Sequence, residues 1–119
     1  MKEKTCEEKI DDMLKMRIKD FQEAIEKYEN SGGEGFVIDG NKYEDFIDWI
    51  NEYCLAYGED GHYRGKRLEL SWGGPADGFI FCEDGTIIYY YQDWFDGAER
   101  ILFGKDYDIM EKVKNYLEV

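Results

Sequence analysis

The sequence is short of several residue types that catalysis and metal binding rely on. It has one histidine, His62, and three cysteines, Cys6, Cys54 and Cys82, which are odd in number and widely spaced. A lone histidine supplies at most one group to a metal site or a catalytic triad. Because no C-x-x-C pair occurs, the cysteines predict neither a disulfide framework nor a zinc knuckle, and reduced thiols fit best.

Long apolar runs are missing as well. No stretch approaches the roughly 20 consecutive apolar residues that a membrane-spanning helix needs. The first twelve residues, MKEKTCEEKIDD, contain no apolar segment of the kind found in a signal peptide. We therefore expect a soluble, cytoplasmic protein that makes no contact with a membrane.

Basic residues are outnumbered. Lysine and arginine total 15 against 28 aspartates and glutamates, which gives a formal net charge of -13. Such a surface repels phosphate, so we expect no direct binding to DNA, RNA or an anionic membrane. The expected partner is a basic protein, and the most obvious basic protein surfaces in a cell are those that hold nucleic acid.

Apolar material is present in sufficient amount for one domain. Hydrophobic residues make up 43% of the 119 residues, and a chain of this length is too short for two separate cores. Thr5 and Glu8 form a T-x-x-E capping box ahead of apolar residues spaced three and four apart, which predicts a helix over residues 6–30. The same spacing, with Asn41 as N-cap, predicts a second helix over about residues 41–58.

After the second predicted helix the apolar period changes to two, which is typical of strands. Asp96-Gly97 is a dipeptide favoured in two-residue hairpin turns, and such a turn would place Asp93 opposite Arg100. The expected fold class is α+β: a single domain with two N-terminal helices, one C-terminal helix and an antiparallel sheet of about four strands. The four strands are expected at residues 66–72, 78–82, 86–95 and 98–103.

The acids are concentrated in two blocks. Residues 29–60 hold nine acids against Lys42 alone, and residues 77–99 hold six acids and no base. On the predicted second helix, three acids spaced i, i+3, i+7 share one face and cover roughly 10 Å, comparable to a few phosphates of a DNA strand. A solvated face is the alternative interpretation. We expect both blocks to gather into one surface that a cationic groove accepts. The candidate partner-binding residues are Glu44, Asp45, Asp48, Glu52, Glu59, Asp60, Asp93 and Asp96.

Catalysis has a weaker basis in the sequence. Asp93 and Asp96, together with His62, are the combination that a small metal-dependent or hydrolytic enzyme would use. With 28 acids in the chain, however, close pairs arise by chance, and no phosphate-binding glycine motif occurs. We expect a protein that is not an enzyme and holds no cofactor or metal. The aromatic run over residues 89–95 is expected to send some of its rings to the surface, because alternate residues of a strand face opposite ways.

Two stretches, LELSWGGPADGFIF and TIIYYYQDWFDGAER, resemble small acidic proteins of bacteriophages and mobile elements. The likeness covers residues 68–100, and its most distinctive words are GGPADGF and YYYQDWFDGA. Proteins of this kind include anti-CRISPR and antirestriction inhibitors, which often occupy the DNA-binding surface of a defence nuclease. The resemblance and the acidic blocks together lead us to expect an anti-CRISPR protein that mimics DNA in the host cytoplasm and blocks a CRISPR effector or another defence nuclease; the resemblance itself implies no specific target and carries over no residue roles. The alternative is an immunity protein or antitoxin that neutralises a basic nuclease toxin.

Overall fold

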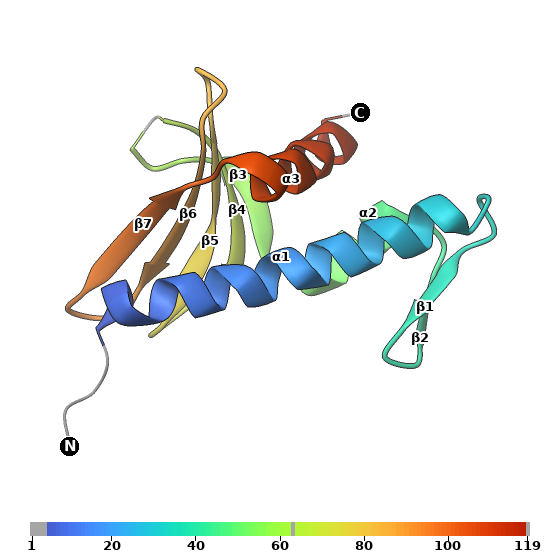
Figure 1. Cartoon of the computed structure of the whole chain (residues 1–119), viewed down its shortest axis with the longest axis horizontal. Helices are drawn as coiled ribbons and strands as arrows, with labels where there is room; N and C mark the ends of the chain where they lie inside the picture. The colour runs from blue at the N-terminus through green and yellow to red at the C-terminus, as the bar shows by residue number, and fades with distance from the viewer. Residues whose placement is uncertain (1–4, 63, 119) are drawn as a thin grey trace.

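The computed structural model describes residues 5–62 and 64–118, which contain three helices and two antiparallel sheets (Figure 1). The α+β fold class is therefore confirmed. The helices are α1 (Cys6–Asn30), α2 (Phe46–Tyr53) and α3 (Gly104–Leu117). The strands are β1 (Phe36–Ile38), β2 (Asn41–Tyr43), β3 (Ala56–Glu59), β4 (Gly65–Ser71), β5 (Ala76–Cys82), β6 (Ile87–Gln92) and β7 (Gly97–Ile101).

Helix α1 begins where the sequence predicts. The Thr5 hydroxyl accepts a hydrogen bond from the backbone N–H of Glu8 at 3.3 Å, and the Glu8 carboxylate accepts one from the backbone N–H of Thr5 at 3.5 Å. This reciprocal capping box satisfies two N–H groups that the helix itself leaves unpaired. With 25 residues, α1 is about 37 Å long, and it runs across the sheet toward the β1–β2 hairpin (Figure 1).

The core lies between α1 and one face of the larger sheet, in which β3 to β7 form a meander in chain order. The Phe21 ring of α1 lies at the centre of this core. Its centroid is 5.9 Å from that of Phe79 on β5 and 5.4 Å from that of Trp49 on α2, both in edge-to-face arrangement. Helix α3 packs beside α1, with Met110 and Val113 fully buried. One continuous apolar cluster thus joins the helices to the sheet.

The predicted second helix is wrong in its extent. Residues 41–43 form strand β2, which pairs with β1 through the Asp39-Gly40 turn, and α2 covers only Phe46–Tyr53. Asp39 and Gly40 both adopt positive φ, the conformation that a two-residue hairpin turn requires. After α2, the chain joins the edge of the large sheet as β3. The two N-terminal helices therefore do not follow one another directly, and a hairpin separates them.

The predicted four-strand sheet is also wrong: the large sheet has five strands and a separate two-stranded sheet accompanies it. The β6–β7 register differs as well. Arg100 lies opposite Tyr89, and Gly97 lies opposite Gln92, so Asp96-Gly97 is not a two-residue turn. The loop between the strands comprises residues 93–96. The Asp93 carboxylate closes it by accepting hydrogen bonds from the backbone N–H groups of Phe95 and Asp96.

Candidate protein-binding surfaces

The acids around α2 gather at the start of that helix. Asp45 is the N-cap, and its carboxylate accepts a hydrogen bond from the Asp48 backbone N–H at 2.9 Å. The Asp48 carboxylate in turn accepts from the backbone N–H of Glu44 at 3.2 Å. These two aspartates therefore form a variant of the capping box, and they place negative charge at the positive end of the helix dipole. Each has a structural role and is exposed at the same time.

The acids around α2 form no ion pair in the described part of the chain, although Lys42 lines the same shallow hollow as Glu44. Glu44, Asp45, Asp48 and Glu52 are all exposed, and within residues 5–62 and 64–118 none of them lies within salt-bridge distance of a lysine or arginine. We name these four residues the α2 acidic surface. Because like charges close together repel, this grouping costs some free energy in the isolated protein.

Glu59 and Asp60 are placed differently. Glu59 is exposed on β3 and pairs with Lys66 at 2.9 Å. Asp60 is buried, with 1% of its surface exposed, and its carboxylate accepts hydrogen bonds from Arg64 and Arg67. Burial alone would raise the pKa of Asp60, but these hydrogen bonds lower it to about 2. A carboxylate enclosed in this way has no free face for a partner, so we leave Asp60 out of the proposed binding surface.

Asp93 and Asp96 lie at the β6–β7 loop and serve the fold. Asp93 closes the loop through the hydrogen bonds described above and does not pair with Arg100. The Asp96 carboxylate accepts a hydrogen bond from the backbone N–H of Cys6 at 2.7 Å, at the first residue of α1. Arg100 instead reaches Glu7 and Asp11 on α1. The loop is thereby fastened to the N-terminal end of α1.

The acids of α2 and those of the β6–β7 loop therefore lie at opposite ends of α1. Asp96 contacts Cys6, whereas the start of α2 packs near Tyr28: the Phe46 ring is 4.9 Å from that of Tyr116, which is 5.7 Å from that of Tyr28. From residue 6 to residue 28 the helix rises about 33 Å. The structure does not bring the acids of α2 and of the last hairpin into one continuous surface.

His62 does not join Asp93 and Asp96 either. Its loop lies beside the β5–β6 turn, where the backbone N–H of Glu83 donates to the carbonyl of Arg64. Asp93 follows at the far end of β6, about 20 Å away along that strand. In the described part of the chain, no three histidine, cysteine, aspartate or glutamate residues are grouped so as to hold a metal ion. Over the same residues, no helix combines the length and the apolarity needed to cross a membrane.

No sequence pattern indicated the buried ion pair of Asp77 with Arg17. Asp77 is fully buried, and both of its carboxylate oxygens accept hydrogen bonds from Arg17 at 2.8 Å. Tyr89 donates to it at 2.6 Å, and the Ser71 hydroxyl also bonds to it. Burial would raise the pKa of Asp77, yet these hydrogen bonds lower it. The network connects α1 to three strands. Because an Asp-Gly dipeptide is typical of an exposed turn, the residues around Asp77 did not indicate this buried network.

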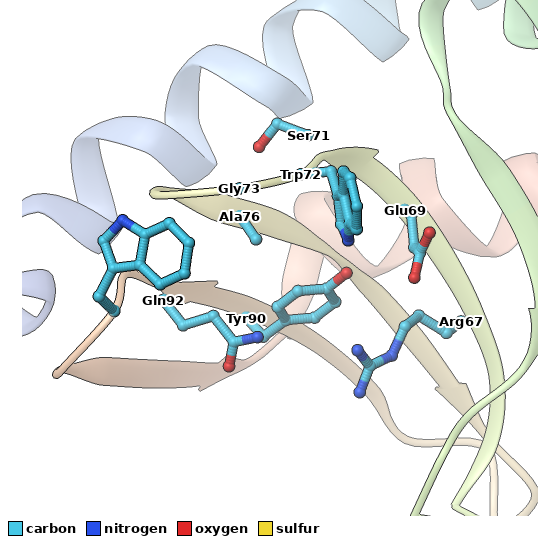
Figure 2. A pocket seen from close by; sticks show the side chains of 9 residues that line it. Arg67, Glu69, Ser71, Trp72, Gly73, Ala76, Tyr90 and Gln92 are labelled. Carbon is cyan, nitrogen blue, oxygen red and sulfur yellow. The ribbon is translucent and has the colours of Figure 1, made fainter.

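A second surface lies on the sheet face turned away from α1, where a pocket of about 320 Å³ opens (Figure 2). Two exposed indoles line the pocket, those of Trp72 (83% exposed) and Trp94 (78% exposed). Tyr90 also lines it, from strand β6 between β5 and β7. The Tyr90 hydroxyl points toward the side where Trp72 and Glu69 lie (Figure 2). We name this site the aromatic pocket. The full lining is Arg67, Glu69, Ser71, Trp72, Gly73, Ala76, Tyr90, Gln92 and Trp94.

Arg67 is fixed at the wall of the aromatic pocket. Its guanidinium carbon lies 4.7 Å from the centre of the Tyr90 ring, and two of its nitrogens donate to Asp60. Burial raises the pKa of Tyr90 to about 12, with Arg67 acting in the opposite direction.

Trp94 and Phe95 do reach the surface, but they lie in the β6–β7 loop, whereas Tyr89, Tyr90 and Tyr91 on strand β6 are all buried. Alternation along a strand is therefore not the reason for their exposure. The meeting of Trp94 with Trp72 at the pocket depends on the sheet register, which the sequence pattern misplaced.

Comparison with family models, with curated proteins and with solved structures finds no match to this chain.

Proposed function

We propose that this protein is an inhibitor that binds a basic, nucleic-acid-binding protein through the α2 acidic surface. The observation that carries the proposal is the group of four exposed carboxylates that form no ion pair with a lysine or arginine of the described residues. Unpaired surface carboxylates raise the electrostatic energy of the free protein, and contact with lysines and arginines of a partner relieves it.

The target that fits this surface best is a CRISPR effector or another defence nuclease. Three of the carboxylates come from about two turns of helix, so they cover roughly 10 Å, the span of a few phosphates. A groove that holds DNA presents lysines and arginines at comparable spacing. In this proposal the protein acts as an anti-CRISPR inhibitor by occupying such a groove in place of target DNA.

Charge reversal on α2 tests the proposal. Glu44→Lys combined with Glu52→Lys alters the α2 acidic surface without removing either helix cap, because Asp45 and Asp48 remain. The readout is a phage interference assay in cells that carry a panel of CRISPR effectors. We expect inhibition to fall by about tenfold or more, since each reversal replaces an attractive contact of about 1 kcal/mol with a repulsive one.

Matched controls separate a local effect from the loss of net charge. Asp12→Lys combined with Glu111→Lys changes the net charge by the same amount at exposed positions of α1 and α3. We expect this variant to inhibit normally. Asp45→Asn combined with Asp48→Asn keeps an acceptor at each cap and removes two charges, and it should weaken inhibition without unfolding α2. Full inhibition by the Glu44 and Glu52 variant would exclude the α2 acidic surface.

A further inference from the structure

We propose that the aromatic pocket binds a cationic side chain, an arginine guanidinium or a lysine ammonium, from a basic protein. The pocket lies on the far face of the sheet and shares no residue with the α2 acidic surface. The inference therefore stands on the pocket's own residues and would hold if α2 bound nothing.

The first support is the exposure of the two indoles. Trp72 and Trp94 leave 83% and 78% of their surface in water, although each carries a large apolar ring. Aromatic residues gathered at one pocket on a protein surface mark an interaction site. The face of an indole ring carries negative electrostatic potential and attracts a cation, by about 0.5 kcal/mol in water and about 2 kcal/mol or more when water is excluded.

The second support is the charge that remains unbalanced in the pocket. Arg67 and Arg64 share the carboxylate of Asp60, and Arg64 also pairs with Glu99 at 3.0 Å, so these two positive and two negative charges cancel. Glu69 is half-buried and lines the same pocket. Within residues 5–62 and 64–118 its side chain makes no hydrogen bond or salt bridge. One negative charge is left over, and a guanidinium or ammonium group would balance it.

The same balance argues against other ligands. A phosphate would meet Glu69 with no free positive charge to offset the repulsion, because Arg67 is already paired with Asp60. A purely apolar group would leave the carboxylate of Glu69 and the Tyr90 hydroxyl without partners in a less hydrated site. A cation stacked on an indole, with its N–H groups directed at Glu69, satisfies both the rings and the carboxylate.

Contacts with the main chain preorganise the aromatic pocket. The Tyr90 ring lies against Gly78, and a Cβ added to Gly78 would come 2.7 Å from the Tyr90 hydroxyl oxygen. The ring fits there because glycine has no side chain. Trp94 lies against Gly74 in the same manner. The Asp93 carboxylate fixes the loop that carries Trp94 through the two backbone hydrogen bonds given above. A site held by main chain in this way loses little conformational entropy on binding.

The test uses N-acetyl-argininamide as the probe and N-acetyl-citrullinamide, its uncharged analogue of the same shape, as the control. Binding is followed by the NMR signals of the indole N–H groups. The buried Trp49 serves as an internal reference. We expect the arginine probe to shift the Trp72 and Trp94 signals at roughly millimolar concentration, and the citrulline probe to bind at least about fivefold more weakly.

Variants of the pocket complete the experiment. Glu69→Gln should weaken binding of the arginine probe about fivefold and remove its dependence on salt, because the ion pair is lost. Trp72→Ala should also weaken binding, and it should fold normally because the side chain is exposed. Glu44→Gln, on the other surface, should bind the probe normally.

Three outcomes would overturn the proposal. The first is equal binding of the arginine and citrulline probes. The second is stronger binding of a neutral sugar such as methyl glucoside, with indole shifts that Glu69→Gln leaves unchanged, which would make the pocket a carbohydrate site. The third is no shift of either indole by the arginine probe at concentrations up to about 100 mM, a limit at which even a very weak contact is detected.

Discussion

Asp60 and Asp77 are buried carboxylates that each accept several hydrogen bonds from charged or hydroxyl groups. Asp77 binds one arginine in a two-pronged contact and two hydroxyl groups, and Asp60 binds two arginines. Such buried pairs fix geometry more than they add free energy, because each charge gives up its hydration to form the pair. Removing one partner is costly, since the other charge then stays buried alone.

The pH dependence of stability should follow from Asp60. Its pKa lies at about 2 in the folded protein, below the ordinary 3.8, so the folded state binds fewer protons than the unfolded state between these values. The contribution of Asp60 to stability is complete above about pH 4 and is lost as the pH falls toward 2. In urea unfolding at a series of pH values, the free energy of unfolding of Asp60→Asn should fall less than that of the wild type between about pH 4 and pH 2. At neutral pH, the free energy of unfolding of Asp60→Asn should be lower than that of the wild type by about 2 kcal/mol. The exposed Asp12→Asn should keep the wild-type slope, and a slope unchanged in Asp60→Asn would contradict this account.

Residue roles could be read from the sequence where they depend on neighbours in the chain. The capping box of Thr5 and Glu8 needs only four consecutive residues and a helical pattern after them, and it is confirmed. Asp60 looks like a solvent-exposed loop acid, because its burial depends on arginines four and seven residues later that fold back over it. The partner of Asp77, Arg17, is sixty residues away, which no local pattern reveals.

At the scale of elements, Asp96 connects the β6–β7 loop to the start of α1. Its carboxylate accepts from the first N–H of the helix, where an anion also interacts favourably with the helix dipole. We expect Asp96→Ala to lower the free energy of unfolding by about 1 to 2 kcal/mol and to speed amide hydrogen exchange in the first turn of α1. Asp96→Asn should lose about half as much, since the amide oxygen still accepts. Equal stability of Asp96→Ala and an exposed control, Glu111→Ala, would show that the contact contributes nothing.

A helix with both a cap and a regular apolar stripe could be predicted from the sequence. The short strands that flank α2 could not. Helix α1 has a cap and a regular apolar stripe, so its extent is correct. Tyr43 and Tyr57 extend the stripe of α2 at helical spacing, yet they reach the core from strands β2 and β3. Backbone pairing places these residues in strands instead of in α2. The Asp39-Gly40 turn pairs β1 with β2, and the Leu55 N–H donates to the carbonyl of Glu69 at the sheet edge. Apolar spacing does not report such pairing.

Across the molecule, the length of α1 keeps the exposed acids of α2 apart from Asp93 and Asp96 of the β6–β7 loop. The sequence shows these acids clearly, but their separation depends on which loop meets which end of the helix. The contacts of Asp96, Arg100 and Phe46 determine it. Helix α1 is long enough to pass the edge of the sheet and carry the β1–β2 hairpin at its far end (Figure 1). A DNA-like surface made from both blocks would need them side by side, so the α2 acidic surface is the part of that hypothesis which the geometry supports.

This separation makes the effect of each charge depend on salt. Charges interact over about 8 Å at physiological salt and about 30 Å at 0.01 M, and the two ends of α1, near which Asp93 and Glu44 lie, are about 33 Å apart. Glu44→Gln and Asp93→Asn each remove one negative charge, and the asparagine keeps the acceptor that closes the β6–β7 loop. With a nuclease bound through the α2 acidic surface, we expect only Glu44→Gln to slow association at 0.15 M salt, and both variants to slow it at 0.01 M, in stopped-flow measurements. Equal slowing at 0.15 M would mean that the partner contacts both ends at once, since screening leaves no other way for Asp93 to act.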